Sequence, residues 1–318
     1  MRRPRRVLLG IVISMLLLIG MFVLFVGPCP TYASMDVKQA RFYEKTVEAI
    51  DASAAESAIT SEPGRLQAGW AKRDMTPAVG VPMGGYSARP EGKVSTGVRD
   101  RLFVKALSLS DGTDTVVIIG SDMLLVPLYI AVLVREDVGV RSPLTRDDLY
   151  FTASHTHCGP GALAPGIAMN ISAGQYDEAV PEFLAQAFAD AIVEAYEGME
   201  PAKLAHGTVD APQYIKNRTR QGPVDPALNY LVVDQEDGER CYTLRYSAHP
   251  TIFGAGMREF SAEFPGALMR HIEDKTDATA VYLGGAVGSM GPRPPEAPAD
   301  AEKVEAMGRA LGALALQA

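Results

Sequence analysis

The chain has 318 residues, 47% of them hydrophobic and 21% charged, which is an ordinary composition for a globular protein of one large or two small domains. Its formal net charge of -8 argues against nucleic acid as a partner, because phosphate backbones are bound through basic surfaces. Three cysteines are too few for a disulfide framework.

An uncharged apolar run, residues 7–26, follows four arginines at the amino terminus. The run is long enough to span a bilayer as a helix and longer than the usual signal-peptide core of ~7–15 residues. The arginines place the amino terminus in the cytoplasm. We therefore expect a transmembrane anchor with the remaining chain on the extracytoplasmic side. Residues 31–33 resemble a small-residue cleavage site, so a cleaved signal and a secreted protein are the alternative.

Three regions are predicted: a signal anchor (residues 1–34), a membrane-proximal helix and linker (35–65), and a folded α/β domain (66–318). Apolar residues recur at nearly helical spacing over 36–52 and predict the helix. The following stretch is rich in Ser, Ala, Glu and Pro and predicts the linker, with a disordered spacer as the alternative interpretation of the whole region.

Strands and helices alternate along the third region. Predicted strands begin near residue 66 and cover 102–109, 115–119, 149–153, 204–209, 228–233, 241–247 and 279–283. Predicted helices cover 124–134, 180–196, 265–273 and 301–317. The alternation predicts a mixed, mostly parallel sheet flanked by helices and preceded by the transmembrane helix. A turn at 236–238 predicts one antiparallel hairpin.

Polar side chains follow three of these strands. Asp122 follows 115–119, His155 and His157 follow 149–153, and His249 follows 241–247. While the backbone stays extended, His155 and His157 point to the same side. Neutral imidazole is a good zinc ligand, so the pattern predicts a metal site to which His249 contributes. The alternative is a set of structural, hydrogen-bonded histidines.

Three further features of the sequence could take part in binding or catalysis. Arg218, in the basic segment 214–220, could clamp an oxyanion or a carboxylate, or could belong to a solvated loop. The glycine-rich segment 284–291 could bring backbone N–H groups close to a ligand, but it lacks a phosphate-binding fingerprint. Cys158 is interpreted as a small residue in a tight turn, with a ligand or a nucleophile as alternatives.

Several motifs occur in the order found in one known family. From about residue 67 onward, the chain resembles the amino-terminal domain of the neutral/alkaline (non-lysosomal) ceramidases. The resemblance is carried by residues 68–77, 83–87, 98–106, 154–161, 217–218, 247–251 and 261–266. The most specific of these motifs is Ser-His-Thr-His-Cys-Gly-Pro-Gly at 154–161. It resembles the family signature Thr-His-Thr-His-Ser-Gly-Pro-Gly, with Cys158 in place of the serine.

The resemblance implies a zinc-dependent amidase that cleaves an N-acyl amide, either a ceramide-like lipid or another extracytoplasmic amide, by attack of metal-bound water. It implies that His155 and His249 are zinc ligands. It also implies that His157 is the neighbouring active-site histidine and that Arg218 contacts the substrate. The expected partners are thus a lipid or small-molecule amide and, through the amino-terminal helix, a membrane.

Two departures from the family pattern leave alternatives. Gly291 stands where the family has an active-site serine, and Ser289 is shifted by two residues. The family's other zinc ligands, a glutamate and a tyrosine, lie further along than residue 318. Either the chain is truncated, or Asp122 or Glu263 substitutes, or the site is incomplete. The alternative functions are a degenerate relative that binds a ligand or partner without catalysis, and a metal-free hydrolase that uses Cys158.

Overall fold

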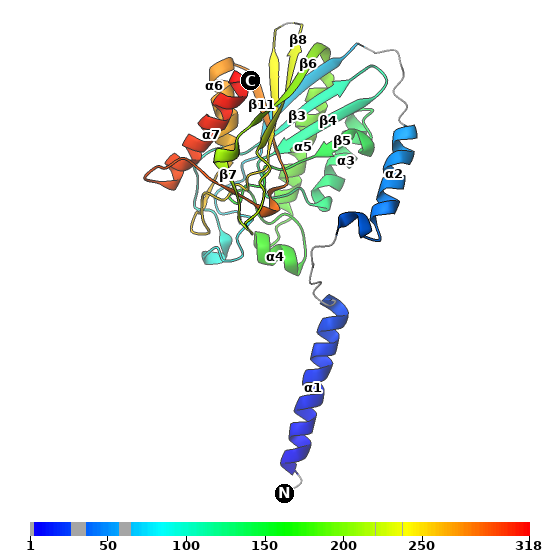
Figure 1. Cartoon of the computed structure of the whole chain (residues 1–318), viewed down its shortest axis with the longest axis vertical. Helices are drawn as coiled ribbons and strands as arrows, with labels where there is room; N and C mark the ends of the chain where they lie inside the picture. Colours follow the sequence, from blue (N-terminus) through cyan, green and yellow to red (C-terminus); the bar gives the residue numbers. More distant parts are fainter. Residues whose placement is uncertain (1–2, 27–35, 57–64, 220, 237) are drawn as a thin grey trace. The chain divides into compact units, whose positions relative to one another are not determined.

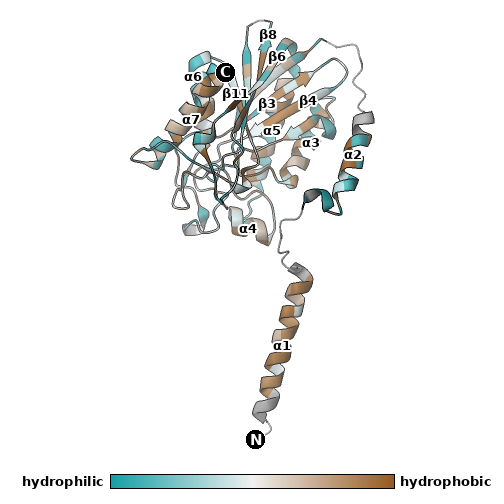
Figure 2. Ribbon diagram, in the orientation of Figure 1, coloured by the Kyte–Doolittle hydropathy of each residue, from teal (hydrophilic) through white to brown (hydrophobic). Residues whose placement is uncertain are grey.

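The computed structural model describes residues 3–26, 36–56, 65–219, 221–236 and 238–318, which form two compact units, Met1–Glu62 and Pro63–Ala318 (Figure 1). The first contains helix α1 (Arg3–Val26) and helix α2 (Tyr43–Glu56), which begins later than predicted. In α1, Val7–Leu24 is apolar on all sides (Figure 2) and long enough to cross a membrane. Signal sequences and anchors share this property. The predicted cleavage segment and most of the predicted linker lie outside the described residues.

The second unit is built on an eight-stranded sheet of order β11-β9-β8-β6-β1-β3-β4-β5. Its strands are β1 (Gln67–Asp74), β3 (Phe103–Ser110), β4 (Thr115–Ser121), β5 (Leu149–Phe151), β6 (Glu200–Asp210), β8 (Ala227–Gln235), β9 (Arg240–Tyr246) and β11 (Thr279–Gly284). Two small pairs are β2 (Gly97–Val98) with β10 (Glu259–Phe260), and β7 (Ile215–Asn217) with β12 (Met290–Pro292). The helices are α3 (Leu128–Arg141), α4 (Ile167–Ala173), α5 (Ala179–Glu197), α6 (Glu263–Thr276) and α7 (Asp300–Gln317).

The prediction of a mostly parallel sheet is wrong. Five of the seven strand pairings are antiparallel, and the parallel ones, β4 with β5 and β9 with β11, lie at the two edges. Each parallel pair is joined through a helix, α3 or α6, as a parallel crossover requires. The other neighbours include direct hairpins, among them the predicted β8–β9 hairpin, which is confirmed.

The sheet folds over so that its two halves face each other. On β3, Leu107 points into a core shared with Val281 of β11, whereas Ala106 points into the core beneath α5. On β11, Tyr282 points the other way, into the core beneath α6 and α7. Alternate side chains of a strand point to opposite faces, so helix pairs α3/α5 and α6/α7 cover the two outer faces (Figure 1).

The two edge strands meet at their carboxyl ends. The Gly284 N–H, at the end of β11, donates a hydrogen bond of 3.2 Å to the carbonyl of Ala153, just past β5. The approach is close, because a Cβ on Gly284 would lie 2.5 Å from that oxygen. The fold thus brings together the segments that follow β5, β9 and β11.

Candidate metal centre

Three histidines converge where these segments meet. His155 and His157 follow β5 and His249 follows β9, and together they offer imidazole nitrogens that all lie within 4.8 Å of one another. The Nε2 atoms of His157 and His249 are 2.8 Å apart. The group could hold a metal ion, because imidazole nitrogen is a common ligand of zinc and other transition metals.

Two of the three rings are oriented as metal-binding imidazoles usually are. His155 Nδ1 lies 2.7 Å from the carbonyl of Leu124, and His249 Nδ1 lies 3.1 Å from the carbonyl of Val287. A carbonyl only accepts, so both Nδ1 atoms carry the hydrogen and both Nε2 atoms keep a lone pair. His157 differs, because its buried Nδ1 has no hydrogen-bond partner among the described residues. The hydrogen bonds of the second ring nitrogen therefore distinguish His155 and His249 from His157.

Burial keeps these imidazoles uncharged. Loss of hydration lowers the pKa of His157 to about 3 and that of His249 to about 4, and it also lowers the pKa of His155. The neighbouring imidazoles and the positive charge of Arg218 act in the same direction. All three rings are neutral at pH 7, which is the protonation state that binds metal.

The backbone brings the histidines together in an unexpected way. Strand β5 ends at Phe151, and His155 has a left-handed conformation with φ 66°, so the segment is not the extended chain that was predicted. Two hydrogen bonds to neighbouring segments hold the backbone turn at His155. The His155 N–H donates to the carbonyl of Met123 at 3.0 Å, and the Thr156 hydroxyl donates to the carbonyl of Ser261 at 2.8 Å.

The segment before β2 supports His157 in ways that the sequence did not reveal. The ring of Tyr86 lies 4.6 Å from the His157 ring, and its hydroxyl donates to the carbonyl of Phe253 at 2.7 Å. The buried guanidinium of Arg89 donates to the carbonyl of His157 at 2.6 Å. Gly85, with φ 105°, comes so close that a Cβ would lie 2.7 Å from His157. The motif at 83–87 marked this segment but not its role.

Neither carboxylate considered as a substitute ligand belongs to the histidine group. Asp122 accepts a 2.9 Å hydrogen bond from the Phe103 N–H, and burial raises its pKa to about 7. Glu263 accepts backbone N–H groups of residues 252, 253 and 264, and burial raises its pKa to about 8. Glu263 therefore holds the segment that follows His249. Among the described residues, the group contains imidazoles alone.

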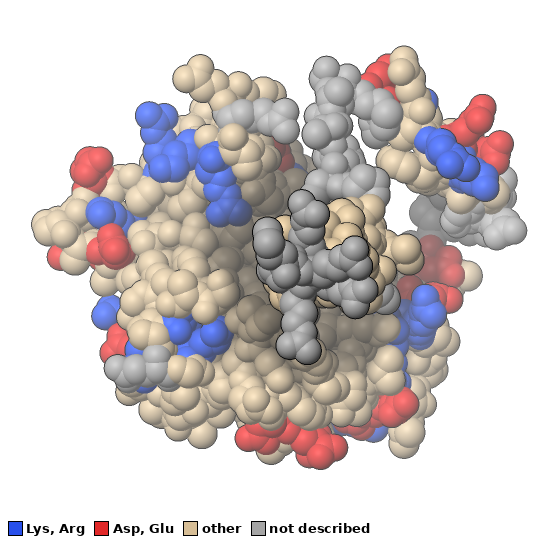
Figure 3. All heavy atoms as spheres, turned by 90° about the horizontal axis from the view of Figure 1, so that it is seen from below, with Lys and Arg blue, Asp and Glu red and all other residues tan. Residues whose placement is uncertain are grey.

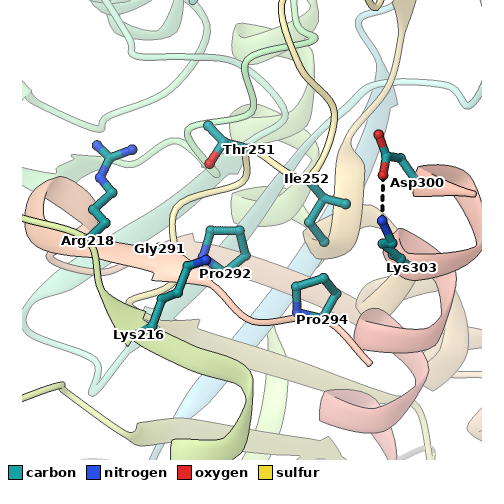
Figure 4. Close-up of a pocket in the computed structure, with 9 residues that line it drawn as sticks. All are labelled: Lys216, Arg218, Thr251, Ile252, Gly291, Pro292, Pro294, Asp300 and Lys303. Atoms are coloured by element: carbon teal, nitrogen blue, oxygen red, sulfur yellow. Dashed lines mark hydrogen bonds and ion pairs between the residues drawn. The ribbon is translucent and has the colours of Figure 1, made fainter. Parts of the chain in front are cut away.

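The remaining candidates lie around the group. Arg218 is exposed, and its Nε donates to the carbonyl of Gly288 at 3.1 Å. It lines a pocket of about 300 Å³ together with Gly291 (Figure 4). Cys158 is buried in the core, which raises the pKa of its thiol to about 12. Such a thiol is a poor nucleophile at neutral pH.

Both the sequence and the fold are similar to those of known proteins. A family model described as neutral/alkaline non-lysosomal ceramidase, N-terminal, matches residues 66–225. The fold is similar to a crystal structure of neutral ceramidase from Pseudomonas aeruginosa (TM-score 0.73, 19% identity, 80% of this chain and 45% of that one). It is equally similar to a ceramidase complexed with C2 (TM-score 0.73, 19% identity, 80% and 43%).

The two structural similarities concern the fold, and this chain spans less than half the length of either ceramidase. No curated protein matches the sequence. The family model covers half of the chain and includes the segment with His155 and His157. The chain therefore belongs to the neutral/alkaline non-lysosomal ceramidase family.

Proposed function

We propose that the protein is a zinc-dependent hydrolase of N-acyl amides, with His155 and His249 as zinc ligands. One observation carries the proposal: both rings donate Nδ1–H to a backbone carbonyl, so that each keeps a lone pair on Nε2, and both belong to one cluster of imidazoles. Membership of the ceramidase family makes amide hydrolysis the expected chemistry. The substrate class is a ceramide-like lipid or another extracytoplasmic amide.

When bound, zinc would lower the pKa of a water molecule to about 7 and polarise the amide carbonyl. The residues of the chain supply the rest. His157 is neutral, and its Nε2 faces that of His249, whose Nδ1 already carries a hydrogen. His157 therefore donates through Nε2, and this N–H is available to stabilise a developing oxyanion once a metal occupies the lone pair of His249. Arg218 binds the carbonyl of Gly288 through Nε and lines the neighbouring pocket, where it would contact the substrate.

The amino-terminal helix α1 gives the proposed enzyme a membrane location. Its apolar surface suits a bilayer, and the arginines before it favour a cytoplasmic amino terminus. We propose that α1 anchors the chain with the hydrolytic unit on the extracytoplasmic side, where it meets lipid or small-molecule amides. Cleavage of α1 as a signal would release the same unit.

The test is hydrolysis of an N-acyl amide by the full chain purified in a non-ionic detergent. Release of fatty acid should stop after treatment with a chelator and return on addition of zinc. Activity that survives complete removal of metal would contradict the proposal. Activity that never appears, in protein shown to hold zinc, would support the second candidate function.

That second candidate is ligand binding without turnover, and Gly291 favours it. The family's active-site serine is replaced there by a residue with no hydroxyl. The two candidates differ in one measurement. Zinc-loaded protein that binds an N-acyl amide and releases no product within the assay would be a binding protein.

A further inference from the structure

The charged side chains around the pocket that Arg218 lines are unevenly distributed. Two strands, β7 and β12, form one wall with Lys216, Gly291 and Pro292, and Thr251 and Ile252 contribute from the segment after His249. Among the described residues that line it, Asp300 is the only acidic one, and it is already paired with Lys303 at 3.0 Å. In Figure 4 this pair lies on the side of the pocket remote from Arg218.

The two remaining cations that line this pocket are Lys216 and Arg218. Neither Lys216 nor Arg218 forms an ion pair with any residue that the structure describes, and both are exposed. Arg218 uses Nε to bind the carbonyl of Gly288, which leaves its Nη atoms free to bind a ligand. Two unpaired cations in one pocket of a chain with a net charge of -8 form a local anion-binding environment.

A second pocket, of about 260 Å³, has no Lys, Arg, Asp or Glu among the described residues that line it. His155 lines it together with the apolar side chains of Leu124, Leu125, Val126, Phe151 and Val287. The segment 284–292 contributes to both pockets, because Val287 lines the uncharged one and Gly291 lines the basic one. His249 is bound to this segment at both places, because its Nδ1 donates to the carbonyl of Val287 and its backbone N–H donates to the carbonyl of Met290, next to Gly291. The histidine group therefore lies next to both pockets.

We propose that the basic pocket binds an anionic head group, so that the preferred substrate is an N-acyl amide carrying a carboxylate or a phosphate beyond the scissile bond. The acyl chain occupies the uncharged pocket, along its leucine, valine and phenylalanine side chains, and the amide lies at the histidines. Lys216 is then a specificity residue. This inference rests on the proposed function for the position of the amide, but the binding preference does not require turnover.

The test measures binding of three amides with the same octanoyl chain to the full-length protein, by isothermal titration calorimetry in a non-ionic detergent. N-octanoylglycine carries a carboxylate, N-octanoyl-phosphoethanolamine a phosphate and N-octanoylethanolamine no charge. We expect at least one anionic amide to bind about 10-fold more tightly than the neutral one at low salt, and the difference to shrink at high salt because screening weakens exposed charge pairs. Whichever anion binds more tightly identifies the head group.

The matched variants are Lys216→Gln and Lys275→Gln. Lys216→Gln should remove most of the preference for the anionic amides over the neutral one. Lys275→Gln removes the same charge from the last turn of α6, away from the pocket, and should change nothing. Equal affinities for all three amides, no binding of either anionic amide, or a preference that survives Lys216→Gln would overturn the inference. Hydrolysis of the same amides is scored separately, so that an anion preference without turnover contradicts the proposed catalysis alone.

Discussion

Single hydrogen bonds distinguish the three histidines more sharply than their spacing does. His155 and His249 each have a backbone carbonyl that fixes the tautomer, and His157 has none. From the sequence, the choice between His155 and His157 as ligand depended on the family resemblance. The hydrogen bonds add an independent physical argument for the same choice, because metal-binding imidazoles usually donate their second N–H to an oxygen.

Gly291→Ser tests whether the family's serine can be restored. A Cβ at this position would lie 3.4 Å from its nearest neighbour, which is an ordinary contact, so the free energy of unfolding should change by less than about 1 kcal/mol. If the restored hydroxyl donates to the oxyanion, amide hydrolysis should rise about 10-fold or more, because one such donor is worth ~10²–10³ in favourable cases. Steady-state kinetics and chemical denaturation measure the two effects.

Gly85→Ala is the contrasting glycine change. Its φ of 105° and the 2.7 Å approach to His157 leave no room for a methyl group. We expect a loss of activity with metal content retained, because the displaced ring is not one of the proposed ligands. A Gly85→Ala variant as active as the parent would contradict the role assigned to His157.

Cys158→Ser tests the elimination of a thiol nucleophile. Serine is the residue that the family has here, so hydrolysis should persist within a few-fold. The position is buried in the apolar core, and burial of a hydroxyl should lower the free energy of unfolding by about 1–3 kcal/mol. Cys158→Ala is the control that removes the sulfur without burying a polar group. Loss of activity in both variants with unchanged metal content would favour the thiol mechanism.

The secondary-structure elements show what a single sequence can and cannot predict. The hydrophobic patterns located most of the large strands and helices, and helix α5 was predicted to within one residue at each end. Strand order was not predictable, because β1, β6 and β8 pair through contacts between residues distant in the chain. Alternation of strands and helices suggested a parallel sheet, but among the described strands of the eight-stranded sheet only β4–α3–β5 and β9–α6–β11 are parallel crossovers.

The histidine group was predictable in part, because the hydrophobic pattern located the strands that precede it. His155 and His249 follow strands that the pattern identified, so their convergence at strand ends was expected. The supporting role of Tyr86 and Arg89 was not, because it depends on the path of an irregular segment whose sequence has no periodicity. The turn at His155 was also hidden, since a left-handed histidine has no sequence signature.

Gly120→Ala tests the contact between the two halves of the sheet. A Cβ on Gly120 of β4 would lie 2.7 Å from the carbonyl of Tyr282 on β11. Overpacking of this kind should lower the free energy of unfolding by about 1–3 kcal/mol. Gly139→Ala is the control, because nothing lies within 4 Å of its Cβ position on α3 and alanine favours a helix by ~1 kcal/mol over glycine. Denaturant titration that found both variants equally stable would contradict the close packing.

The chain as a unit combines an apolar helix with a ceramidase-family domain, and its orientation can be measured. If α1 is an uncleaved anchor with a cytoplasmic amino terminus, the protein remains in the membrane fraction and protease added to intact cells removes the second unit. A soluble mature form that begins near residue 34 would show that the segment is a cleaved signal. A protected second unit would reverse the orientation.

The account as a whole depends on a metal held by His155 and His249, so the most direct measurement is the zinc content of the full-length protein purified without chelators. We expect about one zinc per chain in the parent and in His157→Ala, which should lose hydrolysis alone, and almost none in His155→Ala or His249→Ala. Circular dichroism would check that the zinc-free variants remain folded. A parent protein without zinc, or zinc retained in the folded His155→Ala and His249→Ala variants but lost from His157→Ala, would contradict the account.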